Sequence, residues 1–379
     1  MRIVFFVSSM NAGGAERVAA TLANAWVARG DSVTLVPTFP AKGASFYPLS
    51  EKVDFVWLAD RIAGTSGRVA TSVAKLRAMR ALVRERKPDV VVSFLTNVNV
   101  MTLLALRGMK VPVIVCERTD PVAGKSAASA ALRLLRRIVY PRASVVTLQA
   151  QSGVEAFRRM VPGIRRLEVM PNPLPPELLE APVAPRLKLP GGRQRLVAMG
   201  RLVPDKQFDI LIRAFGRLAG QHPQWDLVIR GEGPCRAALE RQIEEAGLNQ
   251  RVFLPGRTNA PWSELAGATA FALTSAVEGF PNVLMEAMSL GLPCITFDCP
   301  SGPREMTRDG QDALLIPAGD EAAFEAGLSR LLGDEALRDT LAAKAAESVR
   351  ERYALASILK RWDVLMAQAG ASAAHPSKN

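Results

Sequence analysis

Residues 278–286 read Glu-Gly-Phe-Pro-Asn-Val-Leu-Met-Glu, so that one carboxylate stands at each end of a largely apolar run. Gly279 permits a turn, and Pro281 suits the first position of a helix, where an N–H would have no intrahelical partner. The N–H groups of residues 282–284 would then point out of the helix end, which attracts phosphate. The pattern predicts a strand–turn–helix unit that binds an anion, although an ordinary capped core helix with two surface glutamates would also produce it.

Similar units recur along the chain, because short β-branched runs alternate with longer helical patterns. This order predicts an α/β protein with parallel sheets. The expected strands are residues 3–7, 33–36, 90–94, 113–116, 145–148 and 167–170 in the first half, and 196–199, 227–229, 252–254, 271–273, 294–297 and 314–316 in the second. Because 379 residues are too many for one ordinary domain, we predict two doubly wound domains.

Two further glycine turns follow expected strands. Gly13 and Gly14 come after the first strand, where the backbone could approach a ligand closely, although a glycine pair is often only a tight turn. The loop at residues 200–206 brings Arg201 and Lys206 to the end of another strand. The planar fork of Arg and the mobile charge of Lys together suit a diphosphate, although both could be ordinary surface cations. In doubly wound sheets, ligands bind beyond such strand ends.

The stretch 278–286 resembles the E-x7-E motif of the retaining glycosyltransferases of family 4, which have the GT-B fold. The resemblance extends over nearly the whole chain and includes residues 13–17 and 200–206. Residues 298–305 and 117–121 are similar to a narrower group, which adds N-acetylhexosamines, N-acetylgalactosamine among them, or hexoses to polyprenyl-diphosphate-linked or envelope glycans in bacteria. The resemblance implies an α/β protein with two Rossmann-like domains that face each other across a cleft.

The resemblance also gives each part of the chain a role. Residues 1–175 are expected to form an acceptor-binding domain, and residues 193–353 a domain that binds the nucleotide sugar. Prolines and glycines concentrate in residues 176–192, which we expect to be a hinge linker without regular structure. The helical pattern of residues 354–370 is expected to return to the N-terminal domain, as in proteins of this fold.

Individual residues take roles from the same resemblance. Arg201 and Lys206 would neutralise the leaving diphosphate, Glu278 would bind the hydroxyls of the donor sugar, and Glu286 would bind the ribose. Residues 255–259 lie where family members hold the nucleobase. The expected donor-binding residues are Gly13, Gly14, Arg201, Lys206, Arg257, Glu278, Asn282, Val283, Leu284 and Glu286; the expected catalytic residues are Glu278, Arg201, Lys206 and Asp120; and the expected acceptor-side residues are Glu16, Arg118 and Asp120.

Asp120 lies where the chain departs from many family members. They keep a histidine in this region, whereas His222 and His375 of this chain lie elsewhere. The sequence Arg-Thr-Asp-Pro at residues 118–121 resembles the alternative found in the narrower group. A helix N-cap is the plainer interpretation of Asp120, and Glu16 could equally be a charge in the first turn of a helix.

The resemblance implies transfer of a sugar with retention of the anomeric configuration. We expect a UDP-linked N-acetylhexosamine as donor, with GDP as the alternative nucleotide. Because Arg201 and Lys206 would replace a metal, we expect no metal ion and no other cofactor. A front-face reaction and a double displacement through Glu278 both fit. The alternatives are a sugar-nucleotide epimerase of the same fold and a nonenzymatic basic protein that binds a membrane or nucleic acid. The absence of G-x-G-x-x-G spacing disfavours an oxidoreductase.

The excess of basic residues is confined to the first half of the chain. Up to residue 185 there are 25 Lys and Arg against 13 Asp and Glu, and the rest holds 23 of each kind. Basic and apolar residues share helical spacing in residues 73–87 and 133–139. Both patterns fit helices on an anionic membrane surface, or ordinary helices with a solvated basic face. Few aromatic residues accompany them, so we expect a membrane and no nucleic acid as partner.

The remaining features concern the compartment. The four cysteines have no paired or metal-site spacing, and the first seven residues are typical of a strand and not of a signal peptide. No stretch reaches the roughly 20 apolar residues that cross a bilayer. We therefore expect a cytoplasmic protein, peripheral on the inner face of the cytoplasmic membrane, that uses a lipid-linked glycan acceptor.

Overall fold

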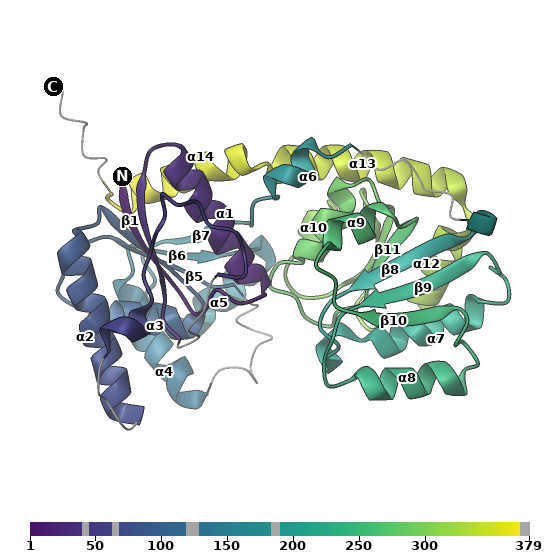
Figure 1. Cartoon of the computed structure of the whole chain (residues 1–379), viewed down its shortest axis with the longest axis horizontal. Coiled ribbons are helices and arrows are strands. Elements are labelled where there is room, and N and C mark those ends of the chain that lie inside the picture. Colours follow the sequence, from purple (N-terminus) through teal and green to yellow (C-terminus); the bar gives the residue numbers. More distant parts are fainter. Residues whose placement is uncertain (40–44, 63–67, 119–128, 183–189, 372–379) are drawn as a thin grey trace. The chain divides into compact units, whose positions relative to one another are not determined.

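The computed structural model describes residues 1–39, 45–62, 68–118, 129–182 and 190–371. The chain divides into two compact units (Figure 1). The first unit contains Met1–Pro173 and Ile358–Asn379, and the second contains Leu174–Ser357. Each unit holds one parallel sheet with helices on both faces, so the predicted fold class is confirmed. No helix among the described residues combines the length and apolarity needed to cross a membrane.

The first unit is built on a seven-stranded sheet with the strand order β3-β2-β1-β4-β5-β6-β7. Its strands are β1 (Arg2–Val7), β2 (Ser32–Pro37), β3 (Asp54–Phe55), β4 (Val90–Phe94), β5 (Val113–Cys116), β6 (Val145–Leu148) and β7 (Leu167–Val169). Its helices are α1 (Gly14–Ala28), α2 (Arg68–Arg86), α3 (Thr96–Ala105), α4 (Ala130–Val139), α5 (Val154–Met160) and most of α14 (Leu355–Gln368).

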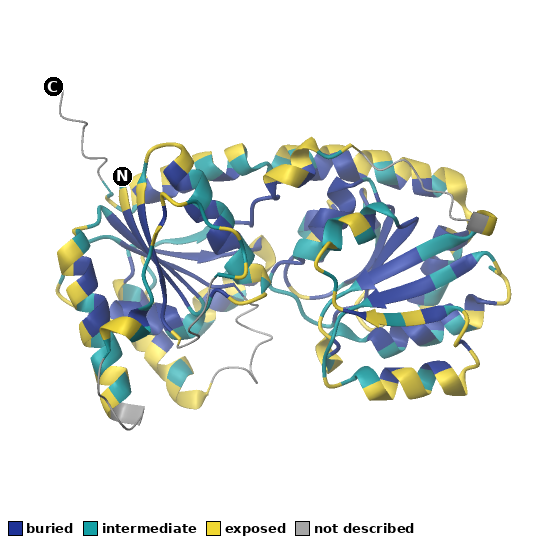
Figure 2. Cartoon of the chain, viewed as in Figure 1, coloured by how far each residue is buried: buried dark blue, intermediate teal, exposed yellow. Residues whose placement is uncertain are grey.

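Side chains alternate between the two faces of this sheet, as the pleat of a strand requires. On β1, Ile3 and Phe5 enter a core beneath α1 and α14. The intervening Val4 and Phe6 enter a second core beneath α2, α3 and α5. Figure 2 shows the result: the inner strands of the sheet are mostly buried, and exposed residues lie on the outer faces of the helices and in loops.

The second unit is built on a six-stranded sheet with the strand order β10-β9-β8-β11-β12-β13. Its strands are β8 (Gln194–Met199), β9 (Trp225–Arg230), β10 (Val252–Gly256), β11 (Ala270–Leu273), β12 (Cys294–Asp298) and β13 (Leu314–Pro317). Its helices are α6 (Pro176–Glu180), α7 (Phe208–Leu218), α8 (Arg236–Glu245), α9 (Pro261–Ala266), α10 (Asn282–Ser289), α11 (Pro303–Met306), α12 (Glu321–Gly333) and α13 (Glu335–Tyr353).

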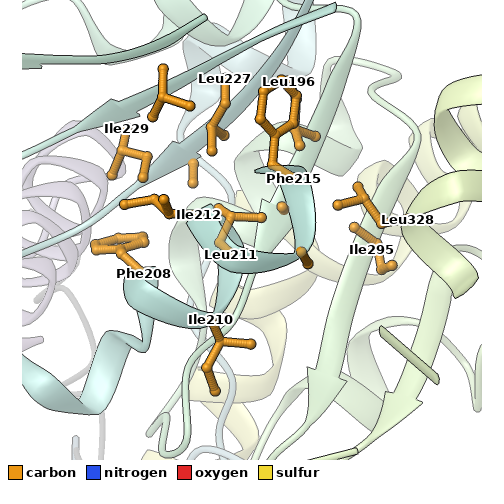
Figure 3. Packing of buried hydrophobic residues seen from close by; sticks show 14 of the residues in the cluster. Leu196, Phe208, Ile210, Leu211, Ile212, Phe215, Leu227, Ile229, Ile295 and Leu328 are labelled. Carbon is orange, nitrogen blue, oxygen red and sulfur yellow. The ribbon is translucent and has the colours of Figure 1, made fainter. Parts of the chain in front are cut away.

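The core of the second unit follows the same alternation. Leu196 on β8, Phe215 on α7 and Leu328 on α12 belong to one hydrophobic core (Figure 3). The next residue, Val197, enters the opposite core, which α10 and α13 cover. The two cores therefore hold the helices, and with them the loops at the strand ends, in fixed places on each face.

Two segments connect the units along the chain. Residues 176–192 were expected to lack regular structure, which is wrong for α6, whose Leu178 is buried in the core of the second unit. On α14, Trp362 lies edge-on to Trp26 of α1, with ring centroids 5.5 Å apart. From Ile358 onward, this helix is therefore part of the first unit.

The strand orders locate a switch point in each sheet. In the second unit the chain runs outward from β8 through β9 to β10, then returns to β11 on the other side of β8. In the first unit, β1 and β4 are related in the same way. The loops after such strands diverge, and ligands of doubly wound sheets bind in the crevice between them. These are the places at which functional side chains are expected.

Candidate active site

The loop after β8 lies against the loop after β9. The N–H of Gly200 donates to the carbonyl of Arg230 at 3.0 Å, and the N–H of Leu202 donates to the carbonyl of Glu232 at 2.9 Å. A Cβ on Gly231 would lie 1.8 Å from the Gly200 carbonyl oxygen, which no neighbouring side-chain movement could relieve. Glycine is therefore required at this position so that the two backbones can meet.

The β8 loop also meets the loop after β11. The hydroxyl of Thr274 donates to the carbonyl of Lys206 at 2.8 Å, and the N–H of Ala276 donates to the carbonyl of Asp205, also at 2.8 Å. These bonds bring Lys206 and Glu278 together across the switch point, although 72 residues separate them in sequence.

Lys206 and Glu278 form an ion pair in which the ammonium group donates to Oε1 of the carboxylate. The hydroxyl of Ser275 donates to the same oxygen at 2.6 Å. The side chains of Lys206 and Glu278 are only 19% and 10% exposed, so solvent screens the pair poorly. The two residues were expected to bind different parts of the donor, whereas in the structure each is the other's partner.

Helix α10 begins one residue later than the sequence predicted. Pro281 occupies the N-cap, and Asn282 is the first helical residue. The N–H groups of Asn282 and Leu284 donate to the carbonyls of Phe280 and Pro281, at 2.9 and 3.0 Å. The expectation of three free N–H groups is therefore wrong for these two. The N–H of Val283 makes no hydrogen bond with another described residue, so one donor still points out of the helix end.

Glu286 is a buried carboxylate, which excludes the surface glutamate that an ordinary capped helix would have carried. Its Oε2 accepts a hydrogen bond of 3.2 Å from the indole N–H of Trp262 on α9. Helix α9 follows the loop after β10, which contains Arg257. Trp262 thus connects Glu286 to the loop that was predicted to hold the nucleobase.

Arg201 and Arg257 are exposed, unlike the carboxylates. Neither side chain forms an ion pair or a hydrogen bond with another residue in the described part of the chain. Arg201 lies in the same loop as Lys206, at the carboxyl end of β8. An exposed guanidinium in the same loop as a paired ammonium group is a suitable arrangement for gripping a diphosphate.

The remaining predicted residues lie in the first unit. Gly13 is the N-cap of α1, Gly14 is its first residue, and the N–H of Gly13 donates to the Tyr47 hydroxyl at 3.2 Å. Glu16 accepts a hydrogen bond of 2.8 Å from Ser9, and a Cβ on Gly13 would lie 2.2 Å from its carboxylate. Because Gly13 has no side chain, the carboxylate of Glu16 can occupy this space at the start of α1.

Arg118, at the end of β5, is buried and donates to Asn172 at 2.5 Å. Its neighbour Glu117 is also buried and accepts hydrogen bonds of 2.6 Å from Tyr140 and from Thr96. Burial raises the pKa of Glu117, and these two bonds oppose that rise. Asp120, the predicted acceptor-side catalytic residue, lies outside the described residues.

Sequence reasoning missed the residues that hold the candidate side chains of each unit in place. Ser275 precedes Glu278 by three residues, a spacing that could have suggested a bond to the carboxylate. Trp262 follows the predicted nucleobase loop directly, but its contact with Glu286 is long-range. Gln149 and Asn172 follow β6 and β7, and their position at strand ends was the available signal.

Two family models together match most of the chain. One, described as "Glycosyl transferase 4-like domain", matches residues 13–173, and the other, described as "Glycosyl transferases group 1", matches residues 183–348. The chain belongs to the group 1 glycosyltransferases. The predicted family is thereby confirmed, and the family matches span the glycine turn after β1 and the whole Glu278–Glu286 stretch.

Individual glycosyltransferases match over nearly the full chain. An alpha-1,4-N-acetyl-D-galactosaminyltransferase of Campylobacter jejuni, named for a diNAcBac-PP-undecaprenol-linked substrate, is 28% identical over 97% of this chain and 99% of its own length. The exopolysaccharide phosphotransferase SCO2592 of Streptomyces coelicolor is 30% identical over 97% of this chain, which spans 41% of that relative. The crystal structure of Anabaena Alr3699/HepE in complex with UDP shares the fold, with a TM-score of 0.82 over 97% of this chain and 100% of that one, at 20% identity.

Proposed function

We propose that this group 1 glycosyltransferase moves an N-acetylhexosamine from a UDP-sugar to a polyprenyl-diphosphate-linked glycan, with retention of the anomeric configuration. The observation that carries the proposal is the Lys206–Glu278 ion pair at the switch point of the second unit. The full-length similarity to an N-acetylgalactosaminyltransferase named for an undecaprenol-linked glycan supports the choice of sugar and acceptor. The solved relative with bound UDP supports the choice of nucleotide.

In the proposed reaction, the donor's diphosphate displaces Glu278 as the partner of Lys206. Glu278 is then released to accept hydrogen bonds from the donor sugar. The bond between C1 of the sugar and the phosphate oxygen breaks, and the acceptor oxygen bonds to C1 on the same face. A departing phosphate oxygen takes the acceptor's proton. Lys206, Arg201 and the N–H of Val283 stabilise the negative charge that develops on the leaving group.

These cations are also why we propose a reaction without a metal ion. A divalent cation in a nucleotide-sugar site neutralises the diphosphate, which is the role that Lys206 and Arg201 take here. The test is turnover of UDP-N-acetylhexosamines, UDP-hexoses and GDP-mannose with a synthetic polyprenyl-diphosphate-linked glycan, with and without EDTA. We expect UDP release that requires the acceptor, a product with the donor's anomeric configuration, and no loss of rate in EDTA.

Three results of this test would contradict the proposal in different ways. An altered UDP-sugar formed without acceptor would indicate an epimerase. An inverted anomer would exclude the retaining mechanism. Salt-sensitive binding to nucleic acid without turnover of any nucleotide sugar would indicate a nonenzymatic protein.

We also propose that the first unit binds an anionic membrane surface on the cytoplasmic side. The two basic helices differ in the structure. On α2, the apolar residues Met79 and Val83 are buried in the core, so that helix is an ordinary amphipathic one. On α4, Leu134 and Ile138 are 60% and 51% exposed. Exposed apolar side chains between arginines are typical of a helix that lies in a membrane interface.

The arginines of α4 divide between the surface and the core. Arg133 and Arg137 are exposed beside the apolar residues. Arg136 belongs to the same basic pattern of residues 133–139 but is buried, 3.8 Å from Glu117 and 5.2 Å from the ring of Phe157. Its ion pair anchors α4 to the first unit and leaves the opposite face of the helix for lipid.

The double variant Leu134→Asp/Ile138→Asp should bind phosphatidylglycerol vesicles about tenfold less tightly or worse, because burying each side chain contributes about 1.5–3 kcal/mol. Sedimentation with vesicles measures the change. The control is Leu179→Asp on α6, an exposed leucine whose helix carries Glu177 and Glu180 in place of arginines. Equal binding by the wild-type protein and the double variant would exclude α4 as the docking surface.

A further inference from the structure

Three strand ends of the first unit meet at one amide. Arg118 follows β5, Gln149 follows β6 and Asn172 follows β7, and these strands are neighbours in the sheet. The Oδ1 atom of Asn172 accepts a hydrogen bond of 2.5 Å from Nη1 of Arg118 and one of 2.9 Å from Nε2 of Gln149. The three side chains therefore form one connected cluster at the carboxyl edge of the sheet, where a doubly wound fold binds its ligands.

No carboxylate among the described residues forms an ion pair with Arg118, the charged member of this cluster. Arg118 is 8% exposed, and its guanidinium carbon lies 3.6 Å from the ring centre of Phe94. Desolvation by burial lowers the pKa of Arg118 to about 10, so the side chain is still charged at neutral pH. Its other two nitrogens have no hydrogen-bond partner in the described part of the chain. A buried charge that has no counter-ion among the described residues is costly and calls for an explanation.

Arg136 provides a comparison within the same unit. It is also buried and also faces an aromatic ring, that of Phe157. Unlike Arg118, however, it lies beside a carboxylate, with Nη1 3.8 Å from Glu117. Within the described part of the chain, one buried guanidinium therefore lies beside a carboxylate, whereas the other lies beside an amide, a phenyl ring and the Cys116 thiol.

The unpartnered atoms of Arg118 define what would fit them. They are Nε and Nη2, whose N–H bonds lie parallel on one edge of the guanidinium. That edge matches two oxygens of a single phosphoryl or carboxylate group. In the same cluster, Oε1 of Gln149 is a buried acceptor that has no hydrogen-bond partner among the described residues. The cluster therefore offers a two-donor seat for an oxyanion together with one acceptor for a hydroxyl group.

We propose that Arg118, Gln149 and Asn172 form a seat for a phosphoryl group of the acceptor's diphosphate. Arg118 holds two phosphate oxygens, Asn172 orients the guanidinium, and Gln149 accepts a hydrogen bond from a hydroxyl of the attached sugar. The choice of a diphosphate rests on the proposed function, in which the acceptor is a polyprenyl-diphosphate-linked glycan. The anion-binding geometry rests on the first unit alone.

The test uses the full chain and inorganic pyrophosphate as probe. UDP is added first, at saturation, so that the donor site of the second unit is occupied, and pyrophosphate is then titrated by calorimetry. We expect the wild-type protein to bind pyrophosphate and Arg118→Met to bind it about tenfold more weakly or worse, because two charge-assisted hydrogen bonds are lost. Arg118→Lys should fall between them, since it keeps the charge without the fork. In turnover, Arg118→Met should raise KM for the acceptor and leave KM for the donor unchanged.

Thermal melting separates a ligand seat from a structural role. Arg118→Met should melt at or above the wild-type temperature, because it removes an uncompensated buried charge. Arg136→Met, the control, should melt lower, because it leaves the buried carboxylate of Glu117 without its cation. Three results would overturn the proposed seat. The wild-type protein and Arg118→Met could bind pyrophosphate equally well, or the UDP-saturated wild-type protein could fail to bind it. The third is an equal loss of thermal stability in Arg118→Met and Arg136→Met. Failure of the wild-type protein to bind UDP would instead contradict the proposed function, and the titration without UDP would still test the seat.

Discussion

Lys206→Ala should lower kcat for sugar transfer about 10²- to 10³-fold, the usual loss when one preorganised group that stabilises a developing negative charge is removed. Lys206 lies in the loop after β8, and its backbone is fixed by Thr274. Its ammonium group needs little reorganisation to reach a diphosphate, because it exchanges one anion, Glu278, for another. The effect should appear mainly in kcat, because the charge on the leaving group grows as the bond breaks.

The Lys206–Glu278 ion pair affects both stability and catalysis, so different variants are needed to measure the two effects separately. Removing Lys206 leaves the carboxylate of Glu278, 10% exposed, with the Ser275 hydroxyl as its remaining hydrogen-bond donor among the described residues. We therefore expect Lys206→Ala to melt at a lower temperature. The double variant Lys206→Met/Glu278→Gln, which removes both charges, should recover stability but not activity.

Steady-state UDP release measures kcat, and melting curves measure thermal stability. Lys344→Ala is the matched control, because Lys344 is an exposed lysine on α13 of the same unit. Recovery of kcat in the double variant would show that the loss in Lys206→Ala was a folding defect. A wild-type kcat in Lys206→Ala would remove Lys206 from the reaction.

Most of the fold was predictable because buried parallel strands have a strong sequence signal. The residues of β4, Val90–Phe94, are apolar except for Ser93, and all are buried because helices cover both faces of the sheet. Strand β3 was missed because two residues, Asp54 and Phe55, are too few to show any periodicity. Helix α6 was missed because prolines precede it, and proline at a helix start resembles proline in a linker.

The details of the site depend on contacts that no local pattern contains. The sequence placed Pro281 inside α10, but the choice between N-cap and first turn depends on the neighbouring loop. A Cβ on Gly302, at φ +110°, would lie 2.5 Å from Cδ of Pro281, so the loop after β12 fits closely against this proline. Likewise, the helical pattern of α4 could not show which arginine turns inward, because Glu117 on another element decides it.

Glu286→Ala should lower kcat/KM for the UDP-sugar about 10²- to 10⁴-fold if its carboxylate accepts two hydrogen bonds from the ribose, each contributing about 1.5–3 kcal/mol. The same contacts exist before and during the reaction, so the loss should appear mainly in KM. Glu286→Gln keeps the shape of the side chain and an oxygen for the indole N–H of Trp262. The decrease in kcat/KM should therefore be smaller for Glu286→Gln than for Glu286→Ala. Trp262→Phe serves as the comparator, because it removes that indole bond and leaves the carboxylate in place.

Nucleotide binding tests the ribose contact more directly than a loss of activity does, because the contact requires a hydroxyl group on the nucleotide as the partner of Glu286. The wild-type protein should bind UDP more tightly than 2′-deoxy-UDP, since the deoxy compound leaves the buried carboxylate of Glu286 without one of its donors. In Glu286→Ala the two nucleotides should bind equally, whereas Trp262→Phe should preserve the preference. Calorimetric titration of the three proteins with both nucleotides measures this coupling directly. A preference for UDP that survives in Glu286→Ala would place the ribose elsewhere, and Glu286 would then be a structural carboxylate that holds α9 against α10.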